Sequence, residues 1–106
     1  MTALEVLESH RSEIVELCRR YCVTRLRVFG SATRPDWNPD TSDFDFLAEF
    51  GPPPPPDIDL FKQQFGLLVD LEALLSRRVD LIEFHPGTRP WFRQIVDSEA
   101  VEWYAA

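Results

Sequence analysis

Apolar residues recur at helical spacing in three segments of the chain. The first predicted helix opens with a capping box, in which Thr2 and Glu5 each bond the other's backbone amide, and it continues to Tyr21. The second covers Asp57 to Ser76, and the third runs from about Pro90 to Tyr104. The expected buried stripes are Leu4, Leu7, Ile14, Leu17 and Tyr21; then Phe61, Phe65, Leu68, Leu71 and Leu75; then Phe92, Ile95, Val96 and Val101.

Three other segments have the alternating or apolar pattern of strands, at residues 24–29, 43–50 and 79–84. In the middle strand one face is predicted to carry Phe44, Phe46, Ala48 and Phe50, and the other Asp43, Asp45, Leu47 and Glu49. The order is therefore helix, strand, short turn, strand, helix, strand, helix. This order predicts an α/β (α+β) fold, in which helices cover mainly one face of a small mixed sheet.

The segments between these elements are rich in proline. A helix that starts at Ser31 can last only about a turn, because Pro35 is tolerated there but Pro39 stops it. Residues 52–56 are five consecutive prolines, which predict a stiff spacer or, alternatively, a segment that docks in an aromatic groove. No repeat and no long linker divides the chain, so we expect residues 1–106 to form a single domain.

The charge of the chain limits its partners. Eighteen acidic residues against eleven basic ones give a formal net charge of −7, which disfavours direct binding to nucleic acid. An acidic chain can still bind a nucleotide when metal cations mediate, and it favours a basic protein partner. We expect no membrane association and a cytoplasmic location, since the sequence shows no signal peptide and no apolar run of about 18 residues.

Several residue types that often carry chemistry are interpreted here as structural. Cys18 and Cys22 lack a second pair with zinc-ligand spacing, so buried free thiols are expected rather than a metal site. His10 is expected at the surface or in an interface, and His85 in a turn. The tryptophans are expected to pack in the core or contact a partner: Trp37, Trp91 and Trp103.

Acidic residues on two predicted strands form the main candidate site. Asp43 and Asp45 lie two apart, so they project from one face of a strand about 6 to 7 Å apart. Taken alone, such a pair is typical of a solvated strand edge. Asp80, near the start of a later strand, would join them if the two strands pair. Three such carboxylates would hold two Mg²⁺ ions about 3.5 to 4 Å apart, the arrangement used in nucleotidyl transfer.

A glycine and a serine follow the first predicted strand. Gly30 allows close approach of an anion, and Ser31 adds a hydroxyl next to free backbone amides, so the turn is a candidate phosphate cradle. A Gly-Ser dipeptide alone is weak evidence. Its combination with the three carboxylates, in this order along the chain, favours a nucleotide site over a solvated strand edge.

These motifs resemble those of the polymerase-beta-type nucleotidyltransferases. The resemblance is carried by residues 28–31 (Val-Phe-Gly-Ser), 42–47 (Ser-Asp-Phe-Asp-Phe-Leu) and 74–81 (Leu-Leu-Ser-Arg-Arg-Val-Asp-Leu). More narrowly, the chain resembles the minimal nucleotidyltransferase (MNT) antitoxins of HEPN–MNT toxin–antitoxin pairs. The resemblance implies that the metal ligands are Asp43, Asp45 and Asp80, and that Gly30, Ser31 and Arg34 bind the nucleotide.

The same resemblance implies an activity. It would be Mg²⁺-dependent transfer of AMP from ATP to a tyrosine hydroxyl of a cognate HEPN ribonuclease toxin, which silences the toxin in a heteromeric complex. Two alternatives stay open: an antitoxin that neutralises its toxin by binding alone, and a nucleotidyltransferase that acts on a small molecule.

Overall fold

The computed structural model describes residues 2–51, 60–84, 87 and 89–106. The five prolines, the first residues of the second predicted helix and His85 lie outside these described residues. The elements are α1 Ala3–Ser9, α2 Arg11–Arg20, β1 Val23–Phe29, the short 3₁₀ helix η1 Gly30–Thr33, β2 Phe44–Phe50, α3 Leu60–Leu75, β3 Val79–Glu83, α4 Pro90–Glu99 and β4 Val101–Ala105.

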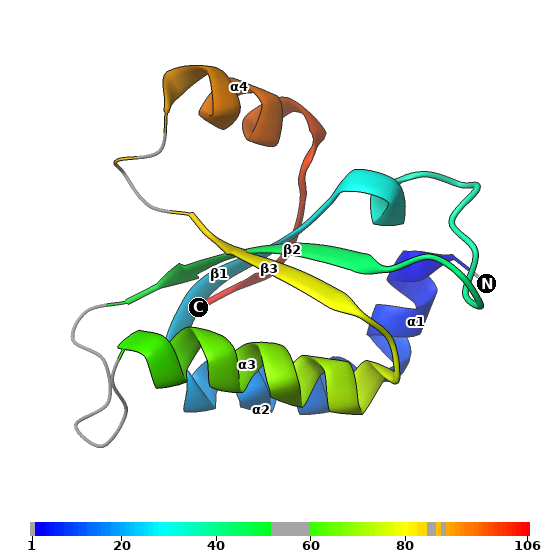
Figure 1. The fold of residues 1–106 in the computed structure, drawn as a ribbon, viewed down its shortest axis with the longest axis horizontal. Helices are drawn as coiled ribbons and strands as arrows, with labels where there is room; N and C mark the ends of the chain where they lie inside the picture. Colours follow the sequence, from blue (N-terminus) through cyan, green and yellow to red (C-terminus); the bar gives the residue numbers. More distant parts are fainter. Residues whose placement is uncertain (1, 52–59, 85–86, 88) are drawn as a thin grey trace.

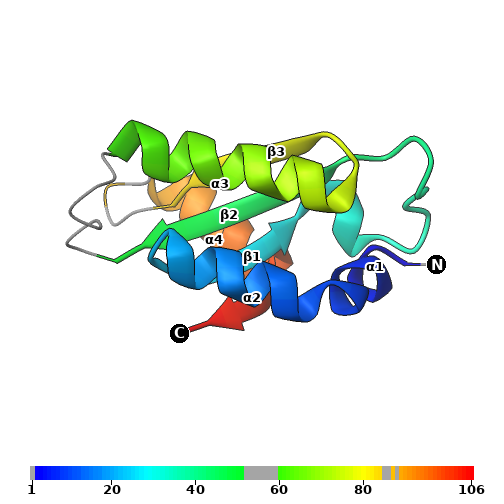
Figure 2. The same cartoon turned by 90° about the horizontal axis from the view of Figure 1, so that it is seen from below.

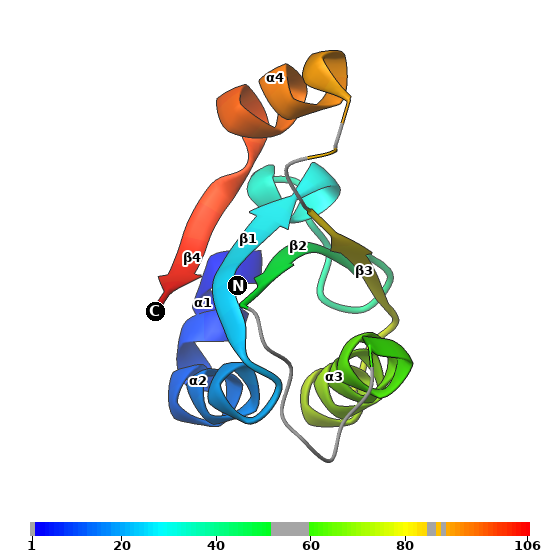
Figure 3. The ribbon, with the colours of Figure 1, turned by 90° about the vertical axis from the view of Figure 1, so that its left-hand side faces the viewer.

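The strands form one mixed sheet in the order β3-β2-β1-β4. β1 pairs antiparallel with β2 and β4, whereas β2 and β3 run parallel. Helices α1, α2 and α3 lie on one face of this sheet and α4 lies on the other (Figures 1 and 3). The predicted small mixed sheet with helices mainly on one face is confirmed.

The core lies between the sheet and the three helices α1–α3. Phe44, Phe46 and Ala48 are fully or almost fully buried there, as the alternation in β2 predicts, and Phe50 packs at the edge of this core. On the opposite face Leu47 belongs to a second, smaller cluster with Phe84 and Val96. The alternating pattern of β2 therefore has apolar residues on both faces, since α4 covers part of the second one.

The predicted first helix is two helices. The capping box is confirmed, with Glu5 N–H donating to the Thr2 hydroxyl at 3.2 Å and Thr2 N–H donating to Glu5 at 3.1 Å. The helix nevertheless ends at Ser9, because His10 has φ −118° and ψ 21° and a second helix begins at Arg11. Figure 2 shows α1 and α2 as separate segments. No proline or glycine marks this break, so the local pattern does not reveal it.

The predicted buried stripe of α3 is partly wrong. Phe61 and Phe65 are 72% and 52% exposed, and their rings stack on each other with centroids 5.3 Å apart. Leu71 and Leu75 of the predicted stripe are buried, and Leu67 is buried with them in place of the two phenylalanines. Gln63 is buried on the same side because its side-chain amide donates to the Tyr21 carbonyl at 2.7 Å.

The predicted last helix is also wrong after Glu99. α4 ends at Glu99, and residues 101–105 form the strand β4. This segment adds to the free edge of β1, where Trp103 reaches the core and is only 8% exposed. Satisfying the backbone groups of β1 and burying a large aromatic ring outweigh the helical spacing of the apolar residues. In the described part of the chain no helix is long and apolar enough to cross a bilayer.

The two cysteines are free, as predicted. Cys18 is buried on α2, and burial raises the pKa of its thiol to about 12. Cys22 is only partly buried and lies past the end of α2, with φ 58°. Of the tryptophans, Trp37 and Trp103 pack in the core and Trp91 is 59% exposed.

Candidate active site

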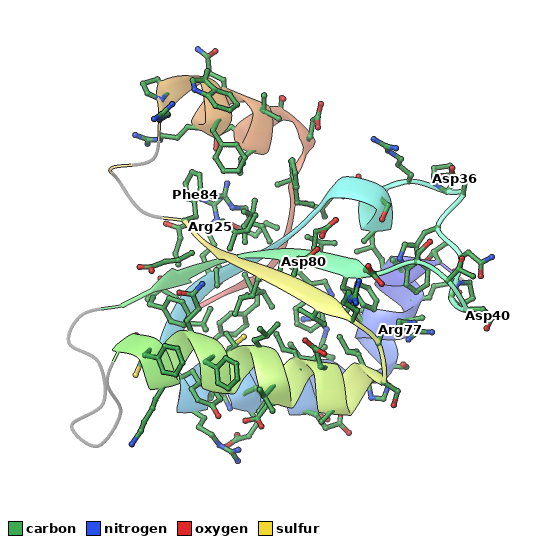
Figure 4. The ribbon with its side chains drawn as sticks, viewed as in Figure 1. Arg25, Asp36, Asp40, Arg77, Asp80 and Phe84 are labelled. Carbon is green, nitrogen blue, oxygen red and sulfur yellow. The ribbon has the colours of Figure 1, made fainter. Side chains whose placement is uncertain are left out.

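Two strand registers place the candidate residues side by side. In the β1–β2 pair Phe29 is opposite Asp45, so Gly30, the next residue, lies next to the Asp45 carboxylate. In the parallel β2–β3 pair Asp45 is directly opposite Asp80. Asp45 alternates with the buried Phe44 and therefore faces away from the helix layer of α1–α3. Figure 4 shows Asp80 on β3.

The carboxyl groups of Asp45 and Asp80 are hydrogen-bonded to each other. The pKa of Asp45 is raised above its ordinary value, first by burial, then by this hydrogen bond, and further by the negative charges of Asp80 and Asp43. Such a pair is unfavourable when both groups are ionised, which favours the protonated form of Asp45 relative to an isolated carboxyl group. A divalent cation between the two carboxylates would remove the same penalty.

Asp43 lies farther from this pair. It raises the pKa of Asp45 through its charge, but among the described residues no three acidic, histidine or cysteine side chains form a cluster with metal-ligand geometry. Asp43 lines a pocket of about 220 Å³ between residues 39–43 and residues 75–78. The structure thus brings two of the three predicted ligands into contact and leaves the third nearby on the same strand segment.

The Gly-Ser turn is fitted closely to Asp45. Gly30 has φ +72°, and a Cβ at this position would lie 2.5 Å from Asp45 Oδ2, which is shorter than a van der Waals contact. Ser31 is partly buried, and its carbonyl accepts a hydrogen bond from the Arg34 N–H at 3.0 Å. Arg34 is exposed. Only glycine provides both this backbone conformation and this approach to the carboxylate.

The donor set of the acid pair fits a divalent cation. Two carboxylates in contact supply the hard oxygen ligands that Mg²⁺ prefers, and they carry an unfavourable charge that a cation would offset. Because Gly30 has no side chain, the backbone of the turn can lie close to the same oxygens. Gly30, Ser31, Asp45 and Asp80 are therefore placed where a metal-bound nucleotide phosphate could be held.

Two further residues border the site and were not among its predicted members. Trp37 was expected to pack or contact a partner; it does pack, and its indole N–H also donates to the Asp43 carbonyl at 3.1 Å. Arg77 follows the end of α3. Its guanidinium donates to the Pro39 carbonyl at 2.9 Å and lies over the Trp37 ring. No short-range pattern predicts either contact, because each partner is several residues or a whole element away.

Comparison with known proteins identifies the family. The nucleotidyltransferase domain family matches residues 11–104. The chain belongs to this family. A solved structure assigned as a minimal nucleotidyltransferase is 33% identical to this nucleotidyltransferase chain, with a TM-score of 0.72 and 95% of each chain covered. A search of curated proteins found no match. The resemblance to the polymerase-beta-type nucleotidyltransferases is confirmed.

More distant structures share the fold of this nucleotidyltransferase domain. A toxin–antitoxin structure with AMP-PNP is 18% identical, with a TM-score of 0.65, and the match covers 90% of this chain and 73% of that chain. A structure of the tri-AMPylated Shewanella oneidensis HEPN toxin in complex with MNT antitoxin is 17% identical, with a TM-score of 0.61 and coverage of 93% and 72%. At these identities the likeness concerns the fold. Members of the family typically use a nucleoside triphosphate and divalent metal ions.

Proposed function

We propose that this nucleotidyltransferase is a Mg²⁺-dependent protein adenylyltransferase, which transfers AMP from ATP to a tyrosine hydroxyl of a cognate HEPN ribonuclease toxin and so acts as its antitoxin. The observation that carries the proposal is the contact between Asp45 and Asp80 directly beside the tight Gly30 turn. Similarity in fold to toxin–antitoxin structures, one of which contains an AMPylated toxin, supports the choice of acceptor.

In this proposal Asp45 and Asp80, with Asp43 turned toward them, hold the Mg²⁺ ions. The ions, when bound, offset the charge of the triphosphate and of the departing pyrophosphate. The backbone amides of the Gly30–Ser31 turn and the Ser31 hydroxyl bind phosphate oxygens, and Arg34 adds a positive charge from the exposed end of η1. Without cations, a chain with a net charge of −7 repels ATP.

The chain's own contribution to the transfer step is orientation and proton acceptance. The tyrosine oxygen bonds to the α-phosphorus while the bond from that phosphorus to the pyrophosphate oxygen breaks. The phenolic proton passes to the exposed carboxylate of Asp80. Because Asp80 is the more exposed member of the acid pair, it is the one that an acceptor from another protein can reach.

The test is label transfer from ATP labelled at the α-phosphate to the protein encoded by the neighbouring gene, mixed with the purified antitoxin. We expect transfer by the parent and a loss of at least about 100-fold in Asp45→Asn, because the variant removes a metal ligand. Glu16→Gln is the matched control, since it removes one negative charge from an exposed position on α2. Equal transfer by the parent and Asp45→Asn would show that the site is assigned wrongly.

The alternative of neutralisation by binding alone is favoured by one observation. The chain exposes large apolar side chains on α3 and α4, including Phe61, Phe65 and Trp91. Exposed aromatic groups of this kind are typical of protein contacts. A growth-rescue assay separates the two functions: if the Asp43→Asn, Asp45→Asn double variant still protects cells from the toxin, binding is sufficient and label transfer is not the antitoxin mechanism.

A further inference from the structure

The two chain segments that lead to the candidate metal ligands are hydrogen-bonded to each other. One is the loop of residues 34–43, which ends at Asp43; the other is the turn between α3 and β3, which leads to Asp80. Phe44, directly after Asp43, donates its backbone N–H to the carbonyl of Arg78 in that turn at 3.2 Å. The positions of the two segments therefore depend on each other.

Trp37 fixes the first segment. It is only 5% exposed, and its ring packs on Phe44 with the ring centroids 5.0 Å apart. Its indole N–H donates to the backbone carbonyl of Asp43 itself at 3.1 Å. The peptide group after Asp43 is thereby held in place, so the freedom that remains to the Asp43 carboxylate is rotation of its own side chain.

Arg77 joins the first segment to the second. Its Nε donates to the carbonyl of Pro39 at 2.9 Å, and its Nη1 to the carbonyl of Leu75 at 3.1 Å. The guanidinium also lies over the rings of Trp37 and Phe44, 5.2 and 5.9 Å from their centroids. Figure 4 shows Arg77 close to the loop that carries Asp40. Lysine cannot replace this residue, because its ammonium group lacks the planar shape with which the guanidinium stacks on the rings and donates to two carbonyls.

We infer that Trp37 and Arg77 are positioning residues for the metal site, an inference that rests on the proposed function. Asp45 and Asp80 are brought together by strand pairing alone. Asp43 precedes the paired part of β2, so its place depends on the loop that Trp37 and Arg77 hold. The two residues set the distance of Asp43 from the acid pair, and through it the affinity for the cation.

The experiment measures binding of Mn²⁺ alone, without ATP, by isothermal titration calorimetry well below the melting temperature of each variant. Trp37→Phe keeps an aromatic ring and removes the N–H that Asp43 accepts. Trp103→Phe is the matched control, since Trp103 is equally a buried core tryptophan but its Nε1 has no hydrogen-bond partner in the described part of the chain. We expect the Kd for Mn²⁺ to rise about tenfold in Trp37→Phe and to stay at the parent value in Trp103→Phe.

Arg77→Lys provides a second probe that leaves Trp37 intact, in case Trp37→Phe does not fold. Its control is Arg11→Lys, because Arg11 also stacks on a tryptophan, 4.3 Å from the Trp103 centroid, but Trp103 is on β4, at the opposite edge of the sheet from Asp80 on β3. If Trp37 and Arg77 had a purely structural role, their variants would have a lower melting temperature and an unchanged affinity for Mn²⁺. That result would overturn the inference. If the parent itself binds no Mn²⁺, the metal site of the proposed function fails and the inference fails with it; if the parent binds and the variants bind equally, only the inference fails.

Discussion

Replacing Asp45 by asparagine should raise the melting temperature of the metal-free protein. Two ionised carboxylates about 4 Å apart repel each other by roughly 4 kcal/mol at an effective dielectric constant of 20. Asp45 is half-buried and Asp80 is exposed, and a shared proton relieves part of the repulsion, so we expect a net gain of about 1 kcal/mol. In a domain of this size that corresponds to a rise of roughly 4 to 8 °C.

The gain should depend on pH. The pKa of Asp45 is raised by burial, by its hydrogen bond with Asp80 and by the neighbouring charges, so the folded protein binds this proton more tightly than the unfolded chain does. The stability that the proton contributes is complete below the unfolded pKa, near about 4, and is lost as the pH rises through the raised folded value. The variant should therefore melt only slightly above the parent near pH 4, and the difference should be largest near pH 8.

In the presence of Mg²⁺ the parent should melt at a higher temperature than Asp45→Asn, the reverse of the order expected without metal. At a Mg²⁺ concentration ten times its Kd, binding to the folded parent adds about 1.4 kcal/mol, and it adds much less to Asp45→Asn. Differential scanning fluorimetry in EDTA and in Mg²⁺ measures both effects. Glu16→Gln, which removes one charge from the opposite helix layer, controls for the general relief of negative charge. If the parent melts at or above Asp45→Asn in EDTA at pH 8, the acid pair does not carry the expected strain and the reasoning is refuted.

Three further changes test other contacts. Gly30→Ala should abolish the Mg²⁺-induced rise in melting temperature, because its Cβ would lie 2.5 Å from Asp45 Oδ2 and turn that carboxylate away; an unchanged rise would contradict this. Gly66→Ala should destabilise the protein by about 1 to 3 kcal/mol in urea denaturation, since its Cβ would lie 2.9 Å from the Tyr21 ring, and a parent-like midpoint would show that α3 can shift instead. Cys18 should resist iodoacetamide at pH 8 in the native protein and react after denaturation, because its thiol pKa is about 12; rapid native alkylation at this residue would show that the core opens.

The sequence predicts a candidate site at Gly30, Asp43, Asp45 and Asp80, but it does not predict the geometry of these residues. Alternation along residues 43–50 predicts that Asp43 and Asp45 project from the same face. It does not show that Asp45 lies opposite Asp80, because the register of two strands joined through a long helix depends on packing over the whole sheet. The unequal roles of the three acids have the same origin: Asp80 is a partner of Asp45 in the β2–β3 register, and Asp43 is not.

The predictions of the fold are wrong where a segment has two possible apolar faces or can pair with more than one neighbouring element. In residues 60–75 the predicted stripe joins Phe61 and Phe65 to Leu71 and Leu75, whereas the stripe that is buried is aliphatic: Leu67, Leu71 and Leu75. Tyr21 contacts α3 at Gln63 and Gly66 in the folded protein. Its carbonyl accepts from the buried Gln63, and its ring occupies the space beside Gly66, so the helix turns the aliphatic stripe inward. Such a contact between α2 and α3 has no signature in either segment alone.

The two faces of the sheet have different roles in this arrangement. The layer of α1–α3 supplies the main core, and the second face holds only a smaller buried cluster. α4 covers only part of that face, where Leu47, Phe84 and Val96 form a small cluster. There Asp97 of α4 pairs with the buried Arg27 at 3.3 Å.

Because α4 is fixed over one part of the sheet, the acid pair stays accessible at another part, next to the Gly30 turn. An acid pair that weakens the metal-free fold is tolerable in this place because the core that stabilises the domain lies on the other side of the same strands.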